Sequence, residues 1–364
     1  MYLFYSEMKQ RKTIRVLIIE DSELMRNELR KMLAHDPLIR VAGTAATGEE
    51  GVEKAVRLKP DVITIDLNLP GMDGLTALQY IMLRQPTPCI VVSAYAKEES
   101  LETFEAFELG AVDVVDKLSV SVKSDELFRR RLIAKIKVAV LANPVKLARA
   151  LPPQKRRPRG PPAFQPSPGR HPRKIVVIGT STGGPRTMMD IIPHLPGGLK
   201  AAYILVQHMP GNFTTAFAER LDQATPLPVN EAGEGEPILC DRIYVAPGDR
   251  HLVLEENGPG FQCVFRLEEN RENDLYVPSI DRTMLSALEI FGGNMIGVIL
   301  TGMGRDGADA MRELMRLGAL TIAESEETAI IYGMPREVIE EGNADITAPS
   351  YDIAAMIINA LKGN

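Results

Sequence analysis

Residues 174–185 read Lys-Ile-Val-Val-Ile-Gly-Thr-Ser-Thr-Gly-Gly-Pro. The apolar, β-branched run over Lys174–Ile178 predicts a buried strand. The glycines that follow allow a tight turn, and Pro185 suits the first turn of a helix. A strand that passes through a glycine turn into a helix is the repeating unit of a parallel α/β sheet.

Apolar runs downstream of this unit predict further strands of the same domain. We expect strands over Ala201–Val206, Met295–Leu300 and Leu320–Ala323, and a helix over Ser279–Phe291. Three shorter runs predict antiparallel strands; they are Arg242–Val245, Leu252–Glu255 and Gln262–Leu267. The expected domain spans residues 174–361 and is a Rossmann-like parallel sheet with an antiparallel insertion.

Upstream, residues 13–142 alternate five short apolar runs with helical patterns. The predicted strands are Arg15–Ile19, Ile39–Thr44, Val62–Ile65, Cys89–Val92 and Val112–Val115. A capping box, Thr47-Gly-Glu-Glu50, opens one of the helices. Five βα units predict a flavodoxin-like sheet, so we expect an α/β chain of two doubly wound domains.

Residues 143–173, between the two domains, have the composition of a linker. Nine prolines fall between Pro144 and Pro172, with few apolar residues and no period. Such a segment buries too little surface to offset the entropy of ordering it. It also lies in a basic band, because fifteen Lys or Arg and no acid fall between Glu126 and Asp190 in a chain of net charge −6.

The basic band has three interpretations: a solvated tether, a contact with acidic neighbours, or a nucleic-acid site. Its proline-rich core contains a single aromatic residue, Phe164. Nucleic-acid surfaces commonly interleave basic and aromatic side chains. We therefore expect no nucleic-acid partner, and we favour the tether over contact with acidic neighbours.

Length and composition are those of a two-domain globular protein, with 364 residues, 45% apolar and 25% charged. The three scattered cysteines, Cys89, Cys240 and Cys263, favour a reducing compartment over a disulfide framework. No run approaches the roughly 18 apolar residues of a spanning helix, and the N-terminus lacks a secretory apolar region. We expect a cytoplasmic protein with no membrane insertion.

Acidic residues follow two predicted strands of the first domain. Glu20 and Asp21 end the first strand and Asp66 ends the third, while Ser93 and Lys117 end the fourth and fifth. Carboxyl ends of parallel strands share one sheet edge, and three carboxylates there call for a hard cation such as Mg²⁺. A hydroxyl and an ammonium beside them suit the oxygens of a phosphorylated aspartate. Helix capping is the alternative for the acidic residues, and for Asp21 taken alone it is as good an explanation.

Several short motifs then resemble a response-regulator receiver domain. They are Ile-Glu-Asp-Ser (19–22), Asp-Leu-Asn-Leu-Pro-Gly-Met-Asp-Gly (66–74), Ser-Ala (93–94) and Gly-Ala-Val-Asp (110–113) with Lys117. The resemblance implies phosphorylation of Asp66 by a histidine kinase. It also implies Mg²⁺ on Asp21, Asp66 and the main-chain carbonyl of Asn68, with Glu20 nearby. Two positions depart from the usual pattern: Leu118 replaces a proline, and Val114 replaces an aromatic residue.

Ser181 lies in the turn after the strand of residues 174–178, and the local sequence leaves two interpretations open. One is a phosphate- or dinucleotide-binding loop, although G-x-G-x-x-G and the P-loop lysine are missing. The other is a nucleophile turn, because residues 179–183 match G-x-S-x-G. A serine nucleophile needs a base, and His208 is the one of five histidines that directly follows a long apolar strand. Asp306 follows another strand, so we favour a Ser-His-Asp triad at the sheet edge.

Five segments in order resemble the chemotaxis protein-glutamate methylesterase family. They are Gly-Thr-Ser-Thr-Gly-Gly (179–184), Val-Gln-His-Met-Pro (206–210), Tyr-Val-Ala-Pro-Gly-Asp-Arg-His (244–251), Leu-Thr-Gly-Met-Gly-Arg-Asp-Gly (300–307) and Tyr-Gly-Met-Pro-Arg (332–336). The order Ser, His, Asp disfavours an ordinary α/β-hydrolase, in which histidine comes last. The resemblance implies removal of methyl groups from glutamate esters on chemoreceptors, and deamidation of some glutamines.

For the esterase reaction we expect no cofactor. Main-chain N–H groups at the Met303 turn and a helix N-terminus, together with Thr182, are candidates for the oxyanion hole. The resemblance also implies that the unphosphorylated receiver covers the active-site face. The rival hypothesis is an output domain that binds a ligand or nucleic acid without catalysis.

Overall fold

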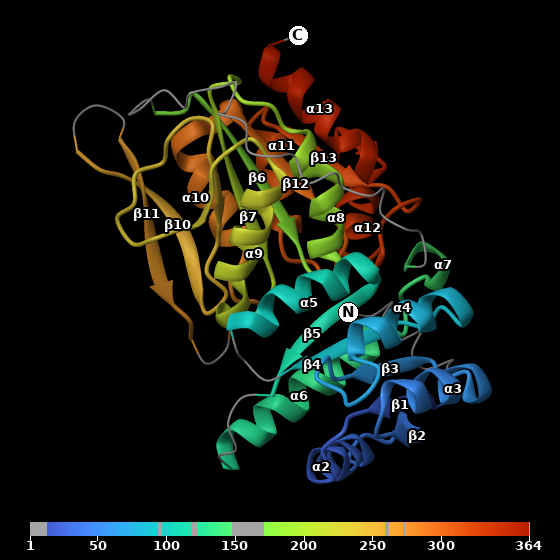
Figure 1. The fold of residues 1–364 in the computed structure, drawn as a ribbon. Coiled ribbons are helices and arrows are strands. Elements are labelled where there is room, and N and C mark those ends of the chain that lie inside the picture. The colour runs from blue at the N-terminus through green and yellow to red at the C-terminus, as the bar shows by residue number, and fades with distance from the viewer. Residues whose placement is uncertain are drawn as a thin grey trace. The chain divides into compact units, whose positions relative to one another are not determined.

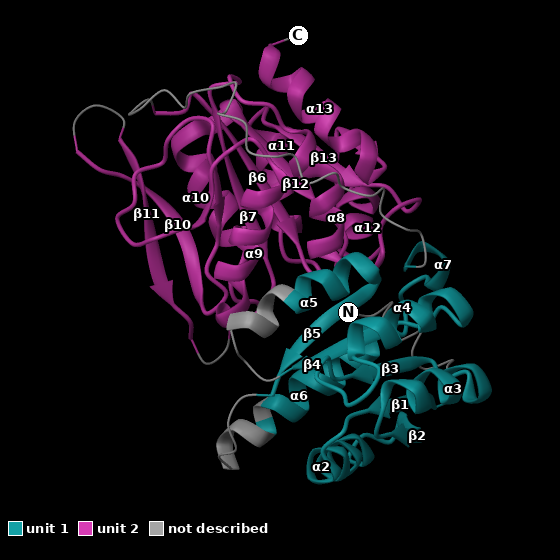
Figure 2. Cartoon of the chain, viewed as in Figure 1, with its two compact units in different colours: residues 1–153 teal, residues 154–364 magenta. Residues whose placement is uncertain are grey.

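The computed structural model describes residues 13–93, 97–117, 122–147, 171–258, 262–271 and 274–363. The chain divides into two compact units, residues 1–153 and 154–364 (Figure 2). Most of the predicted linker, residues 148–170, lies outside the described residues. Among the described helices, none has both the length and the apolar character needed to cross a bilayer.

Unit 1 is a five-stranded parallel sheet with the order β2-β1-β3-β4-β5 (Figure 1). Its elements are β1 (Ile14–Ile19), α2 (Glu23–Ala34), β2 (Ile39–Ala45), α3 (Gly48–Leu58), β3 (Val62–Ile65), α4 (Gly74–Arg84), β4 (Cys89–Ser93), α5 (Lys97–Leu109), β5 (Ala111–Asp116), α6 (Val122–Ala139) and α7 (Pro144–Leu147). This is the predicted flavodoxin-like order, and the chain reverses its direction of winding between β1 and β3.

Unit 2 is a seven-stranded sheet with the order β14-β13-β12-β6-β7-β9-β8, in which every pairing is parallel. Its strands are β6 (Lys174–Thr180), β7 (Ala201–Gln207), β8 (Val229–Glu231), β9 (Ile243–Val245), β12 (Met295–Ile299), β13 (Leu320–Glu324) and β14 (Ile346–Ala348). A separate antiparallel hairpin joins β10 (Arg250–Glu256) to β11 (Cys263–Glu269). The Rossmann-like parallel sheet and the antiparallel insertion are thus both confirmed.

Helices cover both faces of the seven-stranded sheet. They are α8 (Gly184–Ile191), α9 (Gly211–Ala224), α10 (Ile280–Phe291), α11 (Ala308–Arg316), α12 (Met334–Glu340) and α13 (Ser350–Lys362), with 3₁₀ turns at Ile192–His194 and Gly292–Asn294. One layer contains α8, α9 and α13, and the other contains α10, α11 and α12 (Figure 1). Because helices lie on both faces, the central strands are apolar along most of their length, and β7 is buried at every position.

One predicted strand direction is wrong. The run Arg242–Val245 forms β9, which pairs in parallel with both β7 and β8 instead of joining the antiparallel insertion. A strand of three residues has no directional signal of its own, because its direction is set by the connection that precedes it. The segment between β8 and β9 is long enough to return to the starting edge of the sheet, which makes a parallel pairing possible.

Gly248 permits a close approach between two loops of unit 2. A Cβ at this position would lie 2.1 Å from the Met209 carbonyl oxygen and 2.7 Å from the Gly211 nitrogen. The connection after β9 therefore packs directly on the turn that follows His208. Both contacts are with backbone atoms, so no side-chain rotation can relieve the overlap.

We predict that Gly248→Ala destabilises unit 2 by about 1–3 kcal/mol, the usual range for overpacking. Thermal unfolding should show a decrease in melting temperature of several degrees. Gly293→Ala is the matched control, because a Cβ there would find its nearest atom at 3.6 Å. Equal melting temperatures for the two variants would contradict the packing argument.

Candidate active site and phosphorylation site

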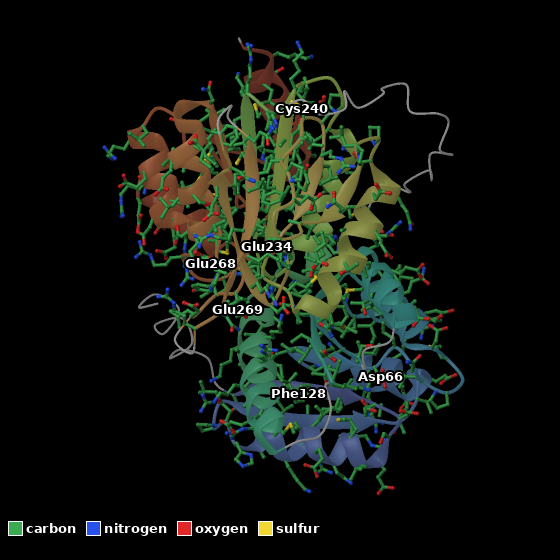
Figure 3. The ribbon with its side chains drawn as sticks, turned by 90° about the vertical axis from the view of Figure 1, so that its left-hand side faces the viewer. Asp66, Phe128, Glu234, Cys240, Glu268 and Glu269 are labelled. Atoms are coloured by element: carbon green, nitrogen blue, oxygen red, sulfur yellow. The ribbon has the colours of Figure 1, made fainter. Side chains whose placement is uncertain are left out.

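The carboxylates of unit 1 gather where its strand order reverses, at the carboxyl ends of β1 and β3. Glu20, Asp21 and Asp66 each offer an oxygen, and these atoms all lie within 4.8 Å of one another. Glu20 and Asp66 are buried, whereas Asp21 is exposed. Asp66 is labelled in Figure 3. The sheet edge thus brings together the three predicted carboxylates.

Lys117 partly neutralises this cluster. Its Nζ lies 2.6 Å from Asp66 Oδ2 and 2.8 Å from Glu20 Oε2, and 9% of its side chain is exposed. Burial lowers the pKa of Lys117, but the two carboxylates outweigh burial and hold the pKa above its ordinary value. Burial raises the pKa of Glu20 despite the contact with Lys117. Lys117 pairs with two of the three carboxylates, and this all-oxygen set fits a hard divalent cation.

The other predicted receiver residues lie at the same edge. Ser93 is buried at the end of β4, and its carbonyl accepts a hydrogen bond from the Lys117 N–H at 2.8 Å. Asn68 is exposed, and its N–H donates to Asp66 Oδ1 at 3.2 Å. Val114, in place of an aromatic residue, is fully packed within β5. The second departure, Leu118, lies outside the described residues.

The candidate catalytic residues of unit 2 also lie where the strand order reverses, between β6 and β12. Ser181 follows β6, His208 follows the neighbouring strand β7, and Asp306 lies in the turn after β12. Strands β6 and β7 are in register up to the pair Thr180 and Gln207. Ser181 and His208 are therefore the next residues of two adjacent strands.

Asp306 is the most heavily hydrogen-bonded of the three candidates. Its Oδ2 accepts from His208 Nε2 at 2.9 Å and from the Ile280 N–H at 2.7 Å. Its Oδ1 accepts from Ser279 Oγ and from the Asp281 N–H, both at 3.1 Å. Three of these four donors belong to the N-terminus of α10, so the carboxylate caps that helix and holds His208 at the same time.

The pKa values of Asp306 and its neighbour Asp281 are shifted in opposite directions. Burial raises the pKa of Asp306, but the hydrogen bonds from His208 and from the N–H groups of α10 hold the pKa below its ordinary value. At Asp281, burial dominates, and the nearby Asp306 charge adds to it, so its pKa is raised to about 6. Asp306 is thus the more readily ionised carboxylate of the pair.

The backbone around Ser181 is fixed from both adjacent strands. The Ser181 N–H donates to the Thr301 carbonyl at 3.0 Å. Gln207 Nε2 donates to the Ser181 carbonyl at 2.9 Å and to the His208 carbonyl at 3.1 Å. A Cβ at Gly302 would lie 2.7 Å from the Ser181 Cβ, so glycine is required there. The turn after β12 therefore approaches Ser181 closely.

The predicted oxyanion residues border this turn. The Thr182 carbonyl accepts from Thr301 Oγ1 at 3.0 Å, and Thr182 is buried. Met303 is partly exposed and adjoins Gly302. Within the described part of the chain, no acceptor pairs with the Met303 N–H.

Sequence reasoning missed three residues of this site. The Tyr276 ring stacks on His208 at a centroid distance of 5.1 Å and an interplanar angle of 13°. Ser279 is expected only as a helix start, yet its hydroxyl reaches Asp306. Gln207 is noted only as part of a motif. The useful signal in each case is proximity to a strand end or helix cap, which cannot by itself identify the partner.

The fold and sites define a class of protein: a response-regulator receiver domain joined to a parallel α/β domain with serine, histidine and aspartate at its sheet edge. The response regulator receiver domain family matches residues 16–129, and the CheB methylesterase family matches residues 176–357. The chain belongs to the CheB methylesterase family.

Full-length relatives share both domains. A protein of Caldanaerobacter subterraneus subsp. tengcongensis, named protein-glutamate methylesterase/protein-glutamine glutaminase, is 45% identical over 97% of this chain and 98% of its own length. A Carboxydothermus hydrogenoformans protein of the same name, numbered 2, is 46% identical over 96% of this chain and 99% of its own. The catalytic domain of Thermotoga maritima CheB methylesterase covers 51% of this chain and 98% of that structure, at 43% identity and a TM-score of 0.50. The predicted family, fold class and hydrolase activity are confirmed, and no comparison supports an output domain without catalysis.

We predict that Asp281→Asn stabilises the protein in a pH-dependent manner. The pKa of Asp281 is raised to about 6 in the folded state from an ordinary value of 3.8. Between about pH 4 and 6, Asp281 is therefore protonated to a greater extent in the folded protein than in the unfolded chain. The free energy of unfolding of the wild type therefore falls as pH rises from about 4 to 6. The asparagine retains an oxygen that can accept from the Ala310 N–H without that penalty.

Urea unfolding at pH 4 and pH 7.5 tests this expectation. The variant should match the wild type at pH 4 and exceed it by about 1–2 kcal/mol at pH 7.5. Glu289→Gln is the control, since Glu289 is an exposed residue of the same helix α10 and should show no such pH-dependent difference. A constant offset between variant and wild type at both pH values would refute the assignment.

Proposed function

We propose that unit 2 hydrolyses glutamate γ-methyl esters in proteins, with Ser181 as nucleophile, His208 as general base and Asp306 as the group that orients the ring. The observation that carries this proposal is the 2.9 Å contact between His208 Nε2 and Asp306 at the sheet edge where Ser181 also lies. The names of the relatives, protein-glutamate methylesterase/protein-glutamine glutaminase, support the choice of substrate bond.

The proton positions on His208 follow from its partner. An ionised carboxylate only accepts hydrogen bonds, so Nε2 carries the proton that binds Asp306. This assignment leaves Nδ1 with a lone pair, and no described residue pairs with it. The ring is 12% exposed. We therefore assign the base function to Nδ1.

The chemistry proceeds in two halves. Ser181 Oγ attacks the ester carbonyl while Nδ1 of His208 takes its proton, and Asp306 stabilises the imidazolium that forms. The imidazolium gives this proton to the leaving methoxide, which departs as methanol and leaves an acyl-enzyme. Water, deprotonated by the same nitrogen, then releases glutamate and restores Ser181.

The oxyanion of each tetrahedral intermediate needs donors beside Ser181. We assign one to the Met303 N–H and propose that Thr182, at the start of the next helix, contributes a second. A glutamine side chain can follow the same route with ammonia as the leaving group. Deamidation would thus need no further catalytic residue.

We further propose that Asp66 accepts a phosphoryl group from a histidine kinase. Glu20, Asp21, Asp66 and the carbonyl of Asn68 would hold Mg²⁺, which neutralises the phosphoryl oxygens when bound. Lys117, already 2.6 Å from Asp66, and Ser93 would contact the remaining oxygens. Methylated chemoreceptors are the proposed protein substrates, and the signal from Asp66 would control access to them.

We predict that Ser181→Ala abolishes methanol release from a methylated receptor. The residue lies in a turn rather than in the core, so the melting temperature should stay within a few degrees of wild type. Gas chromatography or coupled oxidation of methanol provides the measurement. A folded variant that retains more than about a tenth of wild-type activity would exclude the serine mechanism.

We predict that a small-molecule phosphodonor with Mg²⁺ raises the rate of methanol release by the full chain several-fold, because the receiver population shifts toward its active state. Asp66→Asn should abolish the stimulation and leave basal activity unchanged. Chelation of Mg²⁺ should have the same effect on the wild type. Stimulation that persists in Asp66→Asn would place the phosphorylated residue elsewhere.

A further inference from the structure

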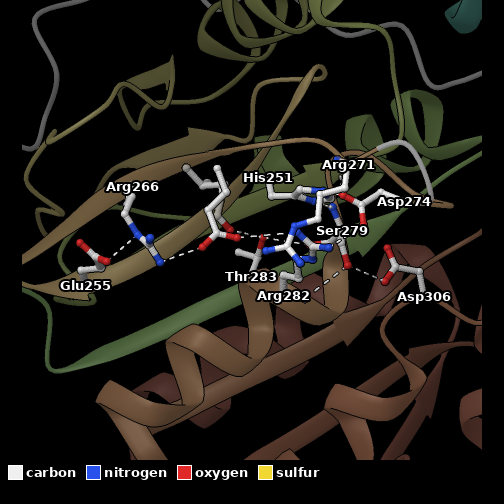
Figure 4. A network of polar contacts seen from close by, with 11 residues as sticks. His251, Glu255, Arg266, Arg271, Asp274, Ser279, Arg282, Thr283 and Asp306 are labelled. Atoms are coloured by element: carbon white, nitrogen blue, oxygen red, sulfur yellow. Dashed lines mark hydrogen bonds and ion pairs between the residues drawn. The ribbon is translucent and has the colours of Figure 1, made fainter.

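His251 is a buried histidine of unit 2 that the proposed chemistry does not use. It lies on β10, and its side chain is 0% exposed. Both ring nitrogens have partners in Figure 4: Nε2 lies 2.8 Å from Asp274 Oδ2, and Nδ1 lies 3.1 Å from the Ser279 nitrogen. The ring therefore has no atom available to a substrate.

These two contacts fix the protonation of the ring. The Ser279 N–H can only donate, so Nδ1 must accept and Nε2 carries the proton that binds Asp274. Asp274 is held independently by the Arg271 N–H at 2.8 Å and by the Arg282 guanidinium at 2.6 Å. The Arg271 N–H, followed by His251, lowers the pKa of Asp274, so this residue is an ionised acceptor. His251 is thus a neutral cross-link between two chain positions.

The two positions are the ends of one loop, residues 274–279. Between them, Tyr276 stacks on His208 at 5.1 Å. At the far end, Ser279 Oγ donates to Asp306 at 3.1 Å, and α10 begins at the next residue. One short loop therefore touches both members of the His208–Asp306 pair.

We propose that His251 is a positioning residue that holds this loop at both ends and so fixes the orientation of His208 and Asp306. The inference rests on the proposed function, because it assigns a purpose to contacts with those two residues. It differs from simple core packing, which would affect folding without affecting the chemical step. An apolar residue of similar size would fill the space but could not hold the loop.

Two substitutions in the full-length chain each keep one of the two hydrogen bonds of the His251 ring and remove the other. His251→Gln retains a donor that reaches Asp274 and has no acceptor at the Nδ1 position. His251→Asn places an amide oxygen near the Nδ1 position and does not reach Asp274. We expect each to lower kcat for methanol release about 10- to 100-fold, the usual consequence of misplaced catalytic groups, with KM within about twofold of wild type. His194→Gln, at an exposed histidine of the same unit, is the control and should change neither constant.

A double-mutant cycle tests the route of the effect. Ser279→Ala removes the hydroxyl from Asp306 but retains the N–H that binds His251. If His251 acts through Ser279, the combined variant should lose less activity than the product of the two single losses. Independent, multiplicative losses would overturn the proposed route.

Folded His251 variants with kcat within twofold of wild type would overturn the inference, and so would a loss confined to KM. If neither variant folds, Tyr276→Leu and Ser279→Ala test the same loop, and wild-type kcat in both would overturn it. Ser181→Ala keeps this failure distinct from that of the proposed function. If Ser181→Ala is inactive and the loop variants are fully active, only the proposed role of His251 is contradicted. If Ser181→Ala is active, the proposed catalytic triad itself is contradicted.

Discussion

The interaction on which unit 2 depends is the burial of the Asp306 carboxylate. An unpaired charge in such a place would cost several kcal/mol, and the chain prevents this with four donors. Three come from the N-terminus of α10, where N–H groups have no partner inside the helix. The fourth is His208. The same carboxylate therefore holds the N-terminus of α10 and orients the His208 ring, so the geometry of the site depends on the packing of that helix.

The two units place their sites at the same kind of position and balance charge there in opposite ways. Each site lies at the carboxyl ends of parallel strands where the strand order reverses. In unit 2, four donors surround the buried carboxylate of Asp306. In unit 1, Lys117 pairs with two of the three clustered carboxylates. Because the carboxylates of unit 1 are only partly neutralised, that edge can bind a cation and a phosphoryl group. The fully hydrogen-bonded Asp306 of unit 2 instead keeps a fixed position and charge.

This geometry explains how much the sequence could predict. Ser181, His208 and Asp306 each follow a buried strand of one parallel sheet, and Asp66 follows a buried strand of the other. Parallel strands end at a common edge, so the pattern alone brings the first three together in unit 2 and places Asp66 beside Glu20 and Asp21 in unit 1. The direction of β9 was wrong because three residues have no signal for direction. Sequence reasoning missed Tyr276 and Ser279 because their loop contacts residues that are distant in the sequence. Their partners lie about 70 and 27 positions away, and nothing local in residues 274–279 identifies those partners.

Unit 2 contains two histidine–aspartate pairs, and their differences show what makes one of them suited to catalysis. His208 is 12% exposed and His251 is 0% exposed. The backbone N–H of Ser279 occupies the lone pair of His251, so this ring cannot take up a proton without losing its contact with the loop. His208 has one nitrogen bound to Asp306 and the other free of described partners. A base needs an open lone pair, whereas a cross-link needs both nitrogens occupied. Hydrogen bonding therefore divides the two roles between chemically identical side chains.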